Sequence, residues 1–159
     1  LHSAKLMDID LLILDFDGVL TDNRVYVMQD GQEAVACHRG DGWGINLLRN
    51  AGLEVIILST ETNPVVSTRA EKLGIECNQG CSDKAEAIRE IIEARRLDPA
   101  RVMYVGNDTN DTEAMAVVGH PVAPADAHPE ILKIAKTVTQ ANGGQGVVRE
   151  LADFLLSTS

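Results

Sequence analysis

The stretch from Leu11 to Asp22 constrains the fold of this chain more than any other part of it. Its first four residues, Leu11 to Leu14, are all apolar, which predicts a strand buried on both faces, as in a parallel sheet. Asp15 and Asp17 follow directly, at the carboxyl end of the strand, where open α/β sheets place their ligands. Gly18 allows the backbone to turn sharply beside them. A lone D-x-D would indicate only an acidic turn, but its position after a buried strand predicts a ligand site.

The composition indicates one domain with an aliphatic core. The 159 residues fit a single domain, expected over residues 1–159, and 45% of them are hydrophobic while only 3% are aromatic. The net charge of −10 argues against nucleic acid and against an anionic membrane as partners. No stretch has membrane-spanning length and no signal peptide is evident, so we expect no membrane partner. Three cysteines without a CxxC pair favour a reduced, cytoplasmic protein.

Strand and helix signals alternate along the chain. Asp30-Gly31, between two apolar runs, predicts a β-hairpin over residues 24–38. We expect Asp41 to cap the next helix and Gly74 to end the following one. The alternation predicts an α/β fold with a doubly wound, Rossmann-like parallel sheet and a β-hairpin flap. Further strands are expected at 54–58, 75–77, 102–105, 121–123 and 137–139, and helices at 41–50, 64–73, 83–97, 112–118, from 128, and at 147–156.

Polar residues follow four of the predicted strands. Because the carboxyl ends of parallel strands share one edge of a sheet, we expect these residues to converge. Phosphoryl transfer needs such a set, with a nucleophile, a cation, hydrogen-bond donors for phosphate and a metal around one phosphorus atom. Each residue also has an ordinary interpretation, as a strand end, a first-turn helix lysine or a helix cap. The four sets are Asp15 with Asp17, Ser59 with Thr60, Lys84, and Asn107 with Asp108 and Asp111.

These sets, in this order, resemble the four motifs of the haloacid dehalogenase-like (HAD) phosphohydrolases over nearly the whole chain. The resemblance implies a HAD-like fold and a phosphatase (phosphomonoesterase) with Mg²⁺ as its cofactor. It implies that Asp15 attacks phosphorus and becomes an aspartyl phosphate, and that Asp17 protonates the leaving alcohol and then activates water. By the same resemblance Ser59, with Thr60 beside it, binds the phosphoryl group, and Lys84 neutralises the nucleophile and the phosphate.

The metal motif departs from the family pattern at one position. The resemblance implies that Mg²⁺ is held by the Asp15 carboxylate, the Asp17 main-chain carbonyl and the fourth motif. That motif usually begins Gly-Asp, but Asn107 stands here in place of the Asp. An amide oxygen ligates Mg²⁺ without bringing charge, so either Asp108 takes over, or the metal is held more weakly, or activity is reduced. Asp111 matches the second acidic residue, usually an outer or indirect partner of the metal.

The chain has no room for a separate cap domain. This cap-less layout resembles the phosphatases of keto-sugar acid biosynthesis, which act on 3-deoxy-octulosonate 8-phosphate or on the 9-phosphates of deaminoneuraminic and N-acetylneuraminic acid. The resemblance implies a phosphorylated sugar acid as substrate and a homotetramer in which neighbouring subunits close the site. It is carried by the hairpin, Asp41-Gly42, residues 69–75, residues 79–84 and the tail at residues 143–150.

Ser59-Thr60-Glu61 is closer to the nonulosonate branch of these phosphatases than to the octulosonate branch, which usually has Thr-Gly-Arg. In the nonulosonate branch a Glu and downstream basic residues contact the sugar acid, and Glu61, Arg69 and Lys72 match them. Arg69 and Lys72 could equally be solvated helix charges. Residues 59–64 and 106–108 also resemble the HAD-like module of CMP-sialic acid synthetases, so a catalytically weak tetramerisation module is one alternative. A HAD phosphatase for an unrelated small phosphate is another.

Overall fold

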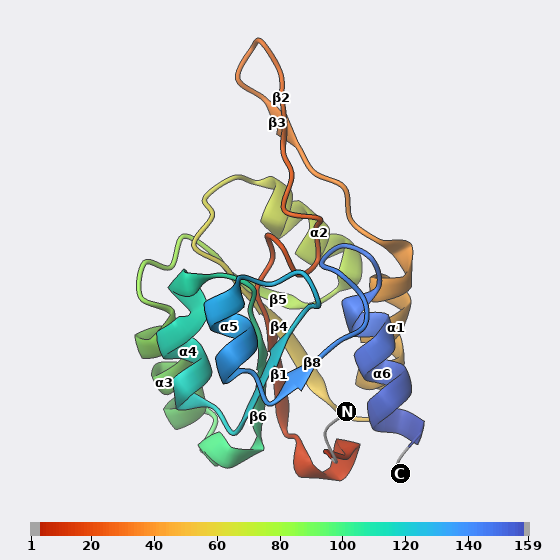
Figure 1. Ribbon diagram of the computed structural model, residues 1–159, viewed down its shortest axis with the longest axis vertical. Coiled ribbons are helices and arrows are strands. Elements are labelled where there is room, and N and C mark those ends of the chain that lie inside the picture. Colours follow the sequence, from red (N-terminus) through yellow and green to blue (C-terminus); the bar gives the residue numbers. More distant parts are fainter. Residues whose placement is uncertain (1–3, 158–159) are drawn as a thin grey trace.

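The computed structural model describes residues 4–157, which form a six-stranded parallel sheet in the order β5-β4-β1-β6-β7-β8. The chain winds outward from β1 in both directions, so the doubly wound α/β prediction is confirmed (Figure 1). The point where the winding reverses lies between β1 and β6, and such a point is where open sheets bind ligands. The strands are β1 (Leu11–Leu14), β4 (Glu54–Leu58), β5 (Glu76–Asn78), β6 (Val102–Val105), β7 (His120–Ala123) and β8 (Thr137–Val138).

Two helical layers cover the sheet, as Figure 1 shows, and each encloses its own apolar core. In β1, Leu12 and Leu14 face one core while Leu11 and Ile13 face the other, because successive side chains of a strand point to opposite faces. The first layer contains α1 (Arg39–Asn50), α2 (Val65–Leu73) and α6 (Val147–Ser157), and the second contains α3 (Lys84–Ala94), α4 (Thr112–Val117) and α5 (Pro129–Ile134).

The predicted hairpin is present and projects from the body of the molecule (Figure 1). It consists of β2 (Tyr26–Val27) and β3 (Glu33–Ala34), which pair antiparallel. Gly31 in its turn has a φ of 89°, a left-handed value that glycine adopts without strain. Apolar side chains on this hairpin are unusually exposed, with Tyr26 at 60% and Val27 at 67% of their full accessibility. Exposed apolar side chains are therefore concentrated on this projecting segment.

Asp41 does not cap its own helix, so that prediction was wrong. α1 begins at Arg39, and the ring nitrogen Nδ1 of His38 accepts the capping hydrogen bond from the Gly40 N–H, at 3.0 Å. Asp41 is buried in the first turn, and its Oδ1 accepts from the N–H groups of residues 148 and 149, at 2.9 and 3.2 Å. It therefore satisfies the start of α6, a helix more than a hundred residues away in the chain.

Other predicted boundaries shift by one to three residues. α3 ends at Ala94, before the expected 97, because Arg96 takes a left-handed φ of 53° that stops the helix. Pro64 is the residue before α2, whereas first-turn placement was expected. Short 3₁₀ helices connect the elements: η1 (Leu6–Asp8), η2 (Pro99–Arg101) and η3 (Thr109–Asp111). Within residues 4–157, none of the helices is both long and apolar enough to cross a bilayer.

Candidate active site

Asp15 lies directly after the central strand β1 and is almost fully buried. Its backbone N–H donates to the carbonyl of Val105 in β6, at 3.0 Å, so the sheet still holds the main chain at this residue. Its Oδ1 accepts from the N–H of Phe16 at 2.8 Å and from Nζ of Lys84 at 3.0 Å. One carboxylate oxygen is therefore held in place, and Oδ2 is left for other contacts.

After Asp15 the chain leaves the sheet in a tight loop. The carbonyl of Phe16 accepts hydrogen bonds from the N–H groups of residues 19–21. Gly18 has a φ of +82°, which favours glycine, and its carbonyl oxygen would lie only 1.9 Å from a Cβ on Gly143. The loop is thus backed by the chain segment that leads to α6. This support holds the main chain of the loop, and with it the Asp17 carbonyl, beside Asp15.

Lys84 and Asp111 form a buried ionic network beside Asp15. Nζ of Lys84, the first residue of α3, lies 3.0 Å from Asp15 Oδ1 and 2.8 Å from Asp111 Oδ1. Asp111 Oδ1 also accepts from the buried Tyr104 hydroxyl at 2.5 Å. Its Oδ2 accepts from the N–H groups of residues 107–108, at 2.9 and 3.2 Å. Because both oxygens of Asp111 are occupied, this residue holds Lys84 and is not placed as a direct metal ligand.

The network shifts the protonation of the carboxyl groups. Burial, reinforced by the charge of Asp111, raises the pKa of Asp15 to about 7, although Lys84 opposes the rise. Burial lowers the pKa of Lys84, but the charges of Asp15 and Asp111 outweigh this effect and the net shift is upward. Burial and then the charge of Glu61 raise the pKa of Asp17. Both carboxyl groups of the D-x-D motif therefore hold a proton more readily than an exposed aspartate.

Asn107, just beyond β6, adds a third group beside the D-x-D loop. The end of its side-chain amide lies 3.0 Å from Asp15 Oδ2 and 3.0 Å from the main-chain oxygen of Asp17. With its nitrogen toward them, the amide donates two hydrogen bonds. With its oxygen toward them, three oxygens face one another, and a cation bound among them makes that arrangement favourable. Neighbouring ligands of octahedral Mg²⁺ lie about 3 Å apart, given bonds of about 2.1 Å, so these oxygens fit that ion.

This candidate metal site depends on a carbonyl and an amide as well as on carboxylate. Among residues 4–157, no three His, Cys, Asp or Glu side chains are grouped closely enough to hold a metal by themselves. A magnesium site here must therefore include main-chain and amide oxygens, both of which are ordinary ligands for a hard cation.

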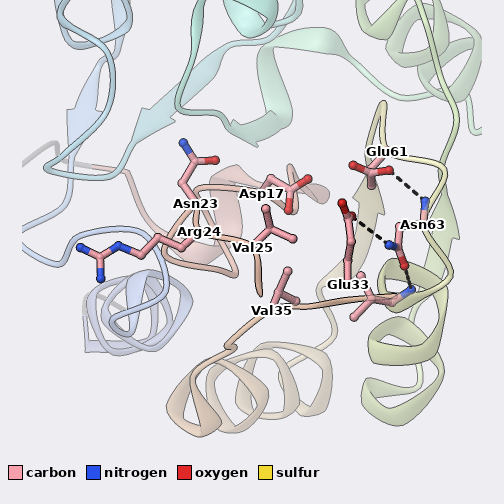
Figure 2. A pocket seen from close by; sticks show the side chains of 9 residues that line it. Asp17, Asn23, Arg24, Val25, Glu33, Val35, Glu61 and Asn63 are labelled. Atoms are coloured by element: carbon pink, nitrogen blue, oxygen red, sulfur yellow. Dashed lines mark hydrogen bonds between the residues drawn. The ribbon is translucent and has the colours of Figure 1, made fainter. Parts of the chain in front are cut away.

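Two adjoining hollows open beside the D-x-D loop. The first has a volume of about 170 Å³, and the second, at the base of the hairpin, has about 240 Å³. Asp17 and Asn23 line both. In the second, Glu33 from the hairpin lies near Glu61 and Asn63 from the loop after β4, and Asn63 Nδ2 donates to Glu33 Oε1 at 3.1 Å (Figure 2). The first is lined by Asp15, Asp17, Asn23, Ser59, Thr60, Asn107, Asp108 and Asn110.

The structure brings most of the predicted site residues together. Six of them line the first hollow, and the Lys84–Asp111 pair lies behind Asp15. Ser59 is buried, and its Oγ accepts from the Glu61 N–H at 3.1 Å. The six residues are Asp15, Asp17, Ser59, Thr60, Asn107 and Asp108.

Arg69 and Lys72 are not part of these hollows. They line a separate one of about 300 Å³ between α1 and α2, together with Arg39 and Trp43. No residue lines both this hollow and the one that contains Asp15. Within a single chain, the predicted basic contacts Arg69 and Lys72 therefore lie apart from the predicted nucleophile, whereas Glu61 lines the second hollow beside it.

Sequence reasoning overlooked three polar residues of the site. Tyr104 points its hydroxyl at Asp111, and Asn23 and Asn110 line the first hollow. One signal was available for Tyr104, because it is a polar-tipped residue inside the apolar strand Val102–Val105. Such a residue needs a buried hydrogen-bond partner.

Comparisons with known proteins agree with this geometry. The model of the haloacid dehalogenase-like hydrolase family matches residues 51–151. The 3-deoxy-D-manno-octulosonate 8-phosphate phosphatase KdsC of Escherichia coli K12 is 42% identical over 154 residues, which cover 96% of this chain and 82% of that protein.

Solved structures give the same result. A Streptomyces avermitilis protein, described only as a HAD family hydrolase, superposes with a TM-score of 0.94 at 48% identity, over 96% of this chain and 88% of that one. The Moraxella catarrhalis 3-deoxy-D-manno-octulosonate 8-phosphate phosphatase, crystallised with magnesium, phosphate and KDO, superposes with a TM-score of 0.92 at 26% identity, over 97% and 89% of the two chains. This chain therefore belongs to the HAD hydrolases, as a phosphatase of the family that includes KdsC.

Proposed function

We propose that this protein is a Mg²⁺-dependent phosphatase of a phosphorylated keto-sugar acid, working through an aspartyl phosphate on Asp15. The observation that carries the proposal is the surroundings of the Asp15 carboxylate. One of its oxygens is held by Lys84, and the other faces Asn107 and the Asp17 carbonyl. The opening in front of it is polar and includes Ser59. This is the set of groups that a phosphoryl group needs around it.

In the first half-reaction, an oxygen of Asp15 forms a bond to phosphorus while the bond from phosphorus to the sugar oxygen breaks. The departing alkoxide takes a proton from the Asp17 carboxyl group. Burial raises the pKa of Asp17, which supports this assignment, because a general acid needs a proton to give. Lys84 offsets the negative charge that gathers on Asp15 and the phosphoryl oxygens, and the Ser59 hydroxyl donates to one of those oxygens.

In the second half-reaction, water attacks the phosphorus of the aspartyl phosphate, and the ionised Asp17 carboxylate accepts the proton of that water. The acyl phosphate bond breaks, which releases inorganic phosphate and restores Asp15. Tyr104 and the main-chain donors of the 107–108 loop keep Asp111, and through it Lys84, in position throughout both steps.

We assign the magnesium site to Asp15 Oδ2, the Asp17 main-chain oxygen and the Asn107 amide oxygen, whose spacing fits the ion. When bound, Mg²⁺ supplies positive charge for the phosphoryl oxygens. Asp108 lines the same hollow, although its Oδ1 already accepts from the Thr109 N–H at 2.7 Å. We place Asp108 outside the inner set, at the rim, because the 3.0 Å contacts with Asp15 Oδ2 and the Asp17 oxygen are those of the Asn107 amide.

The substrate class follows from the relatives and from the second hollow. The curated relatives are phosphatases of 3-deoxy-D-manno-octulosonate 8-phosphate, which makes this octulosonate the first candidate. Carboxylates and amides of Asp17, Glu33, Glu61 and Asn63 border the second hollow and suit the hydroxyl groups of a sugar. Glu61 also keeps a nonulosonate 9-phosphate as the second candidate, because a Glu is typical of that branch.

A substrate panel tests the proposal. Octulosonate 8-phosphate, N-acetylneuraminate 9-phosphate, deaminoneuraminate 9-phosphate and p-nitrophenyl phosphate are compared with Mg²⁺ and with EDTA. We expect Mg²⁺-dependent release of phosphate from all four, with the highest kcat/KM for one of the sugar acids. Absence of turnover on every substrate would instead favour the assembly module related to CMP-sialic acid synthesis. A preference for p-nitrophenyl phosphate would point to an unrelated small phosphate.

We also propose that residues 1–159 act as one cap-less domain within a cytoplasmic homotetramer. The exposed apolar hairpin supports assembly, since Tyr26 and Val27 would otherwise remain in water. The three free cysteines suit a reducing compartment. Light scattering should give four times the chain mass. Tyr26→Ser with Val27→Ser should lower that mass and, with it, sugar-acid turnover.

Arg69 and Lys72 have a role under this proposal only if a sugar-acid carboxylate reaches them. Their hollow is separate from the one with Asp15 in one chain, so the contact would come from a neighbouring subunit. Arg69→Ala should raise KM for the preferred sugar acid and leave p-nitrophenyl phosphate turnover nearly unchanged, since the aryl ester has no carboxylate. Equal losses on both substrates would count against this role.

A further inference from the structure

The surroundings of the Asn107 side chain suit two orientations of its amide. Its amide end lies 3.0 Å from both Asp15 Oδ2 and the Asp17 main-chain oxygen. When no cation is present, the amide nitrogen donates to both oxygens. When a cation sits among them, the amide must turn by half a rotation so that its oxygen faces inward. An aspartate at this position could do only the second, because two carboxylates at this distance repel unless a cation or a proton separates them.

The charges around these three oxygens also disfavour the binding of a cation alone. Of the three oxygens that face one another, only Asp15 Oδ2 belongs to a charged group. The other oxygen of that carboxylate contacts Lys84, whose positive charge offsets it. Both oxygens of Asp111 are already occupied by Lys84, Tyr104 and main-chain N–H groups. A divalent cation that enters among these three oxygens therefore meets almost no net negative charge from its ligands.

We propose that Asn107 makes the divalent cation and the phosphoryl group bind as a pair. Without phosphate, the cation lacks compensating charge and must displace two hydrogen bonds of the amide. Without the cation, the phosphate dianion is repelled by the Asp15 carboxylate, and the charge of Lys84 is shared between the two. Phosphate supplies the negative charge that the cation lacks, and the cation offsets the charge that repels phosphate. By thermodynamic linkage, each must raise the other's affinity by the same factor. The inference rests on the magnesium ligands assigned in the proposed function.

Calorimetry with Mg²⁺ and inorganic phosphate tests the coupling without any turnover. Into the wild-type protein alone, Mg²⁺ should bind with a Kd of about 10⁻³ M or weaker, the range of weak oxygen-ligand sites. With saturating phosphate, and with free Mg²⁺ corrected for its complex with phosphate, the affinity should rise at least about tenfold. Phosphate titrated with and without Mg²⁺ should show the same ratio.

Two variants separate Asn107 from its neighbour. Asn107→Asp adds a charged ligand and removes the competing hydrogen bonds, so Mg²⁺ alone should bind about 10- to 100-fold more tightly and the coupling should shrink. The same variant should melt at a lower temperature in EDTA and recover more than wild type when Mg²⁺ is added. Asp108→Asn is the matched control, because it removes a carboxylate from the same hollow and should leave the coupling ratio unchanged.

The outcomes are distinct. Tight Mg²⁺ binding to the wild type without phosphate, or coupling that Asp108→Asn abolishes and Asn107→Asp leaves intact, would overturn the proposal. If the wild type hydrolyses sugar-acid phosphates in Mg²⁺ but shows no coupling, only this inference fails. If the wild type has no Mg²⁺-dependent turnover and binds neither ligand, the proposed function fails with it.

Discussion

On the α3 side of Asp15, the polar groups of Lys84, Tyr104 and Asp111 hydrogen-bond to one another at 2.5 to 2.8 Å. On the other side, the Asn107 amide meets two oxygens and has a choice of which atom to present. The first side is complete without a ligand, because every contact is made by the chain itself. The second side changes when a cation arrives. This difference suits a site that must hold its nucleophile rigidly yet admit a metal and a phosphate.

Asp15 belongs to both sides, so its replacement should have the largest effect. Asp15→Asn keeps the size of the side chain but cannot form the aspartyl phosphate. We expect phosphatase activity to fall by more than about 10³-fold, as is usual when a nucleophile is lost. The measurement is phosphate release from the preferred substrate, with a circular dichroism spectrum to verify folding. Activity within tenfold of wild type in a folded Asp15→Asn protein would falsify the nucleophile assignment.

Lys84 tests whether the α3 side of Asp15 depends on its internal charge balance. Lys84→Met keeps most of the volume but leaves Asp15 and Asp111 buried without a cation. Removing one partner of a buried ion pair usually costs about 3–5 kcal/mol, and we expect a loss of that size in the free energy of unfolding, together with most of the activity.

Urea denaturation measures the Lys84 effect, and Lys133→Met serves as its control. Lys133 pairs with Glu130 on the surface, where both side chains are mostly exposed. Its loss should cost less than about 1 kcal/mol. Similar losses for the two variants would mean that burial adds nothing to the Lys84 network.

Tyr104 contributes a smaller part of the same network. Tyr104→Phe removes only the hydroxyl that donates to Asp111, while the main-chain and Lys84 donors remain. A hydrogen bond to a charged group is worth about 1.5–3 kcal/mol, so we expect a stability loss in that range and a kcat reduced about tenfold with KM little changed. Met103→Leu, in the same strand, is the matched control, since it conserves volume and packs in the other core. An unchanged kcat for Tyr104→Phe would remove Tyr104 from the positioning of Lys84.

The sequence predicted the central strands and the D-x-D site because those features are local. Leu11–Leu14 and Val102–Val105 are short continuous apolar runs, which are typical of fully buried strands. Parallel topology then brings Asp15, Ser59 and Asn107 to one edge, as expected from the winding of the chain.

The remaining features depend on contacts that no local pattern contains. Asp41 satisfies the N–H groups of residues 148–149, so its role appears only after α1 and α6 are packed together. Arg69 and Lys72 fall in a separate hollow because the packing of α2 beside α1 determines where their side chains lie. In the sequence, Tyr104 resembles a core residue of an apolar strand, and the hydrogen bond from its hydroxyl to Asp111 appears only in the folded structure.

The smallest expected effect, when counted per pH unit, is on the pH dependence of stability without metal. Burial raises the pKa of Asp15 to about 7 from an ordinary value near 4. Between these values the folded protein keeps a proton that the unfolded chain has lost, so this group makes stability fall as pH rises from about 4 to about 7, with no further change above that. One proton gives a slope of at most about 1.4 kcal/mol per pH unit. Urea denaturation in EDTA between pH 5 and pH 8 measures it, and Asp15→Asn should flatten the curve because it has no proton to lose. A wild-type curve that rises over this range, or an Asp15→Asn curve with the same slope, would show that Lys84 keeps Asp15 ionised at all these pH values.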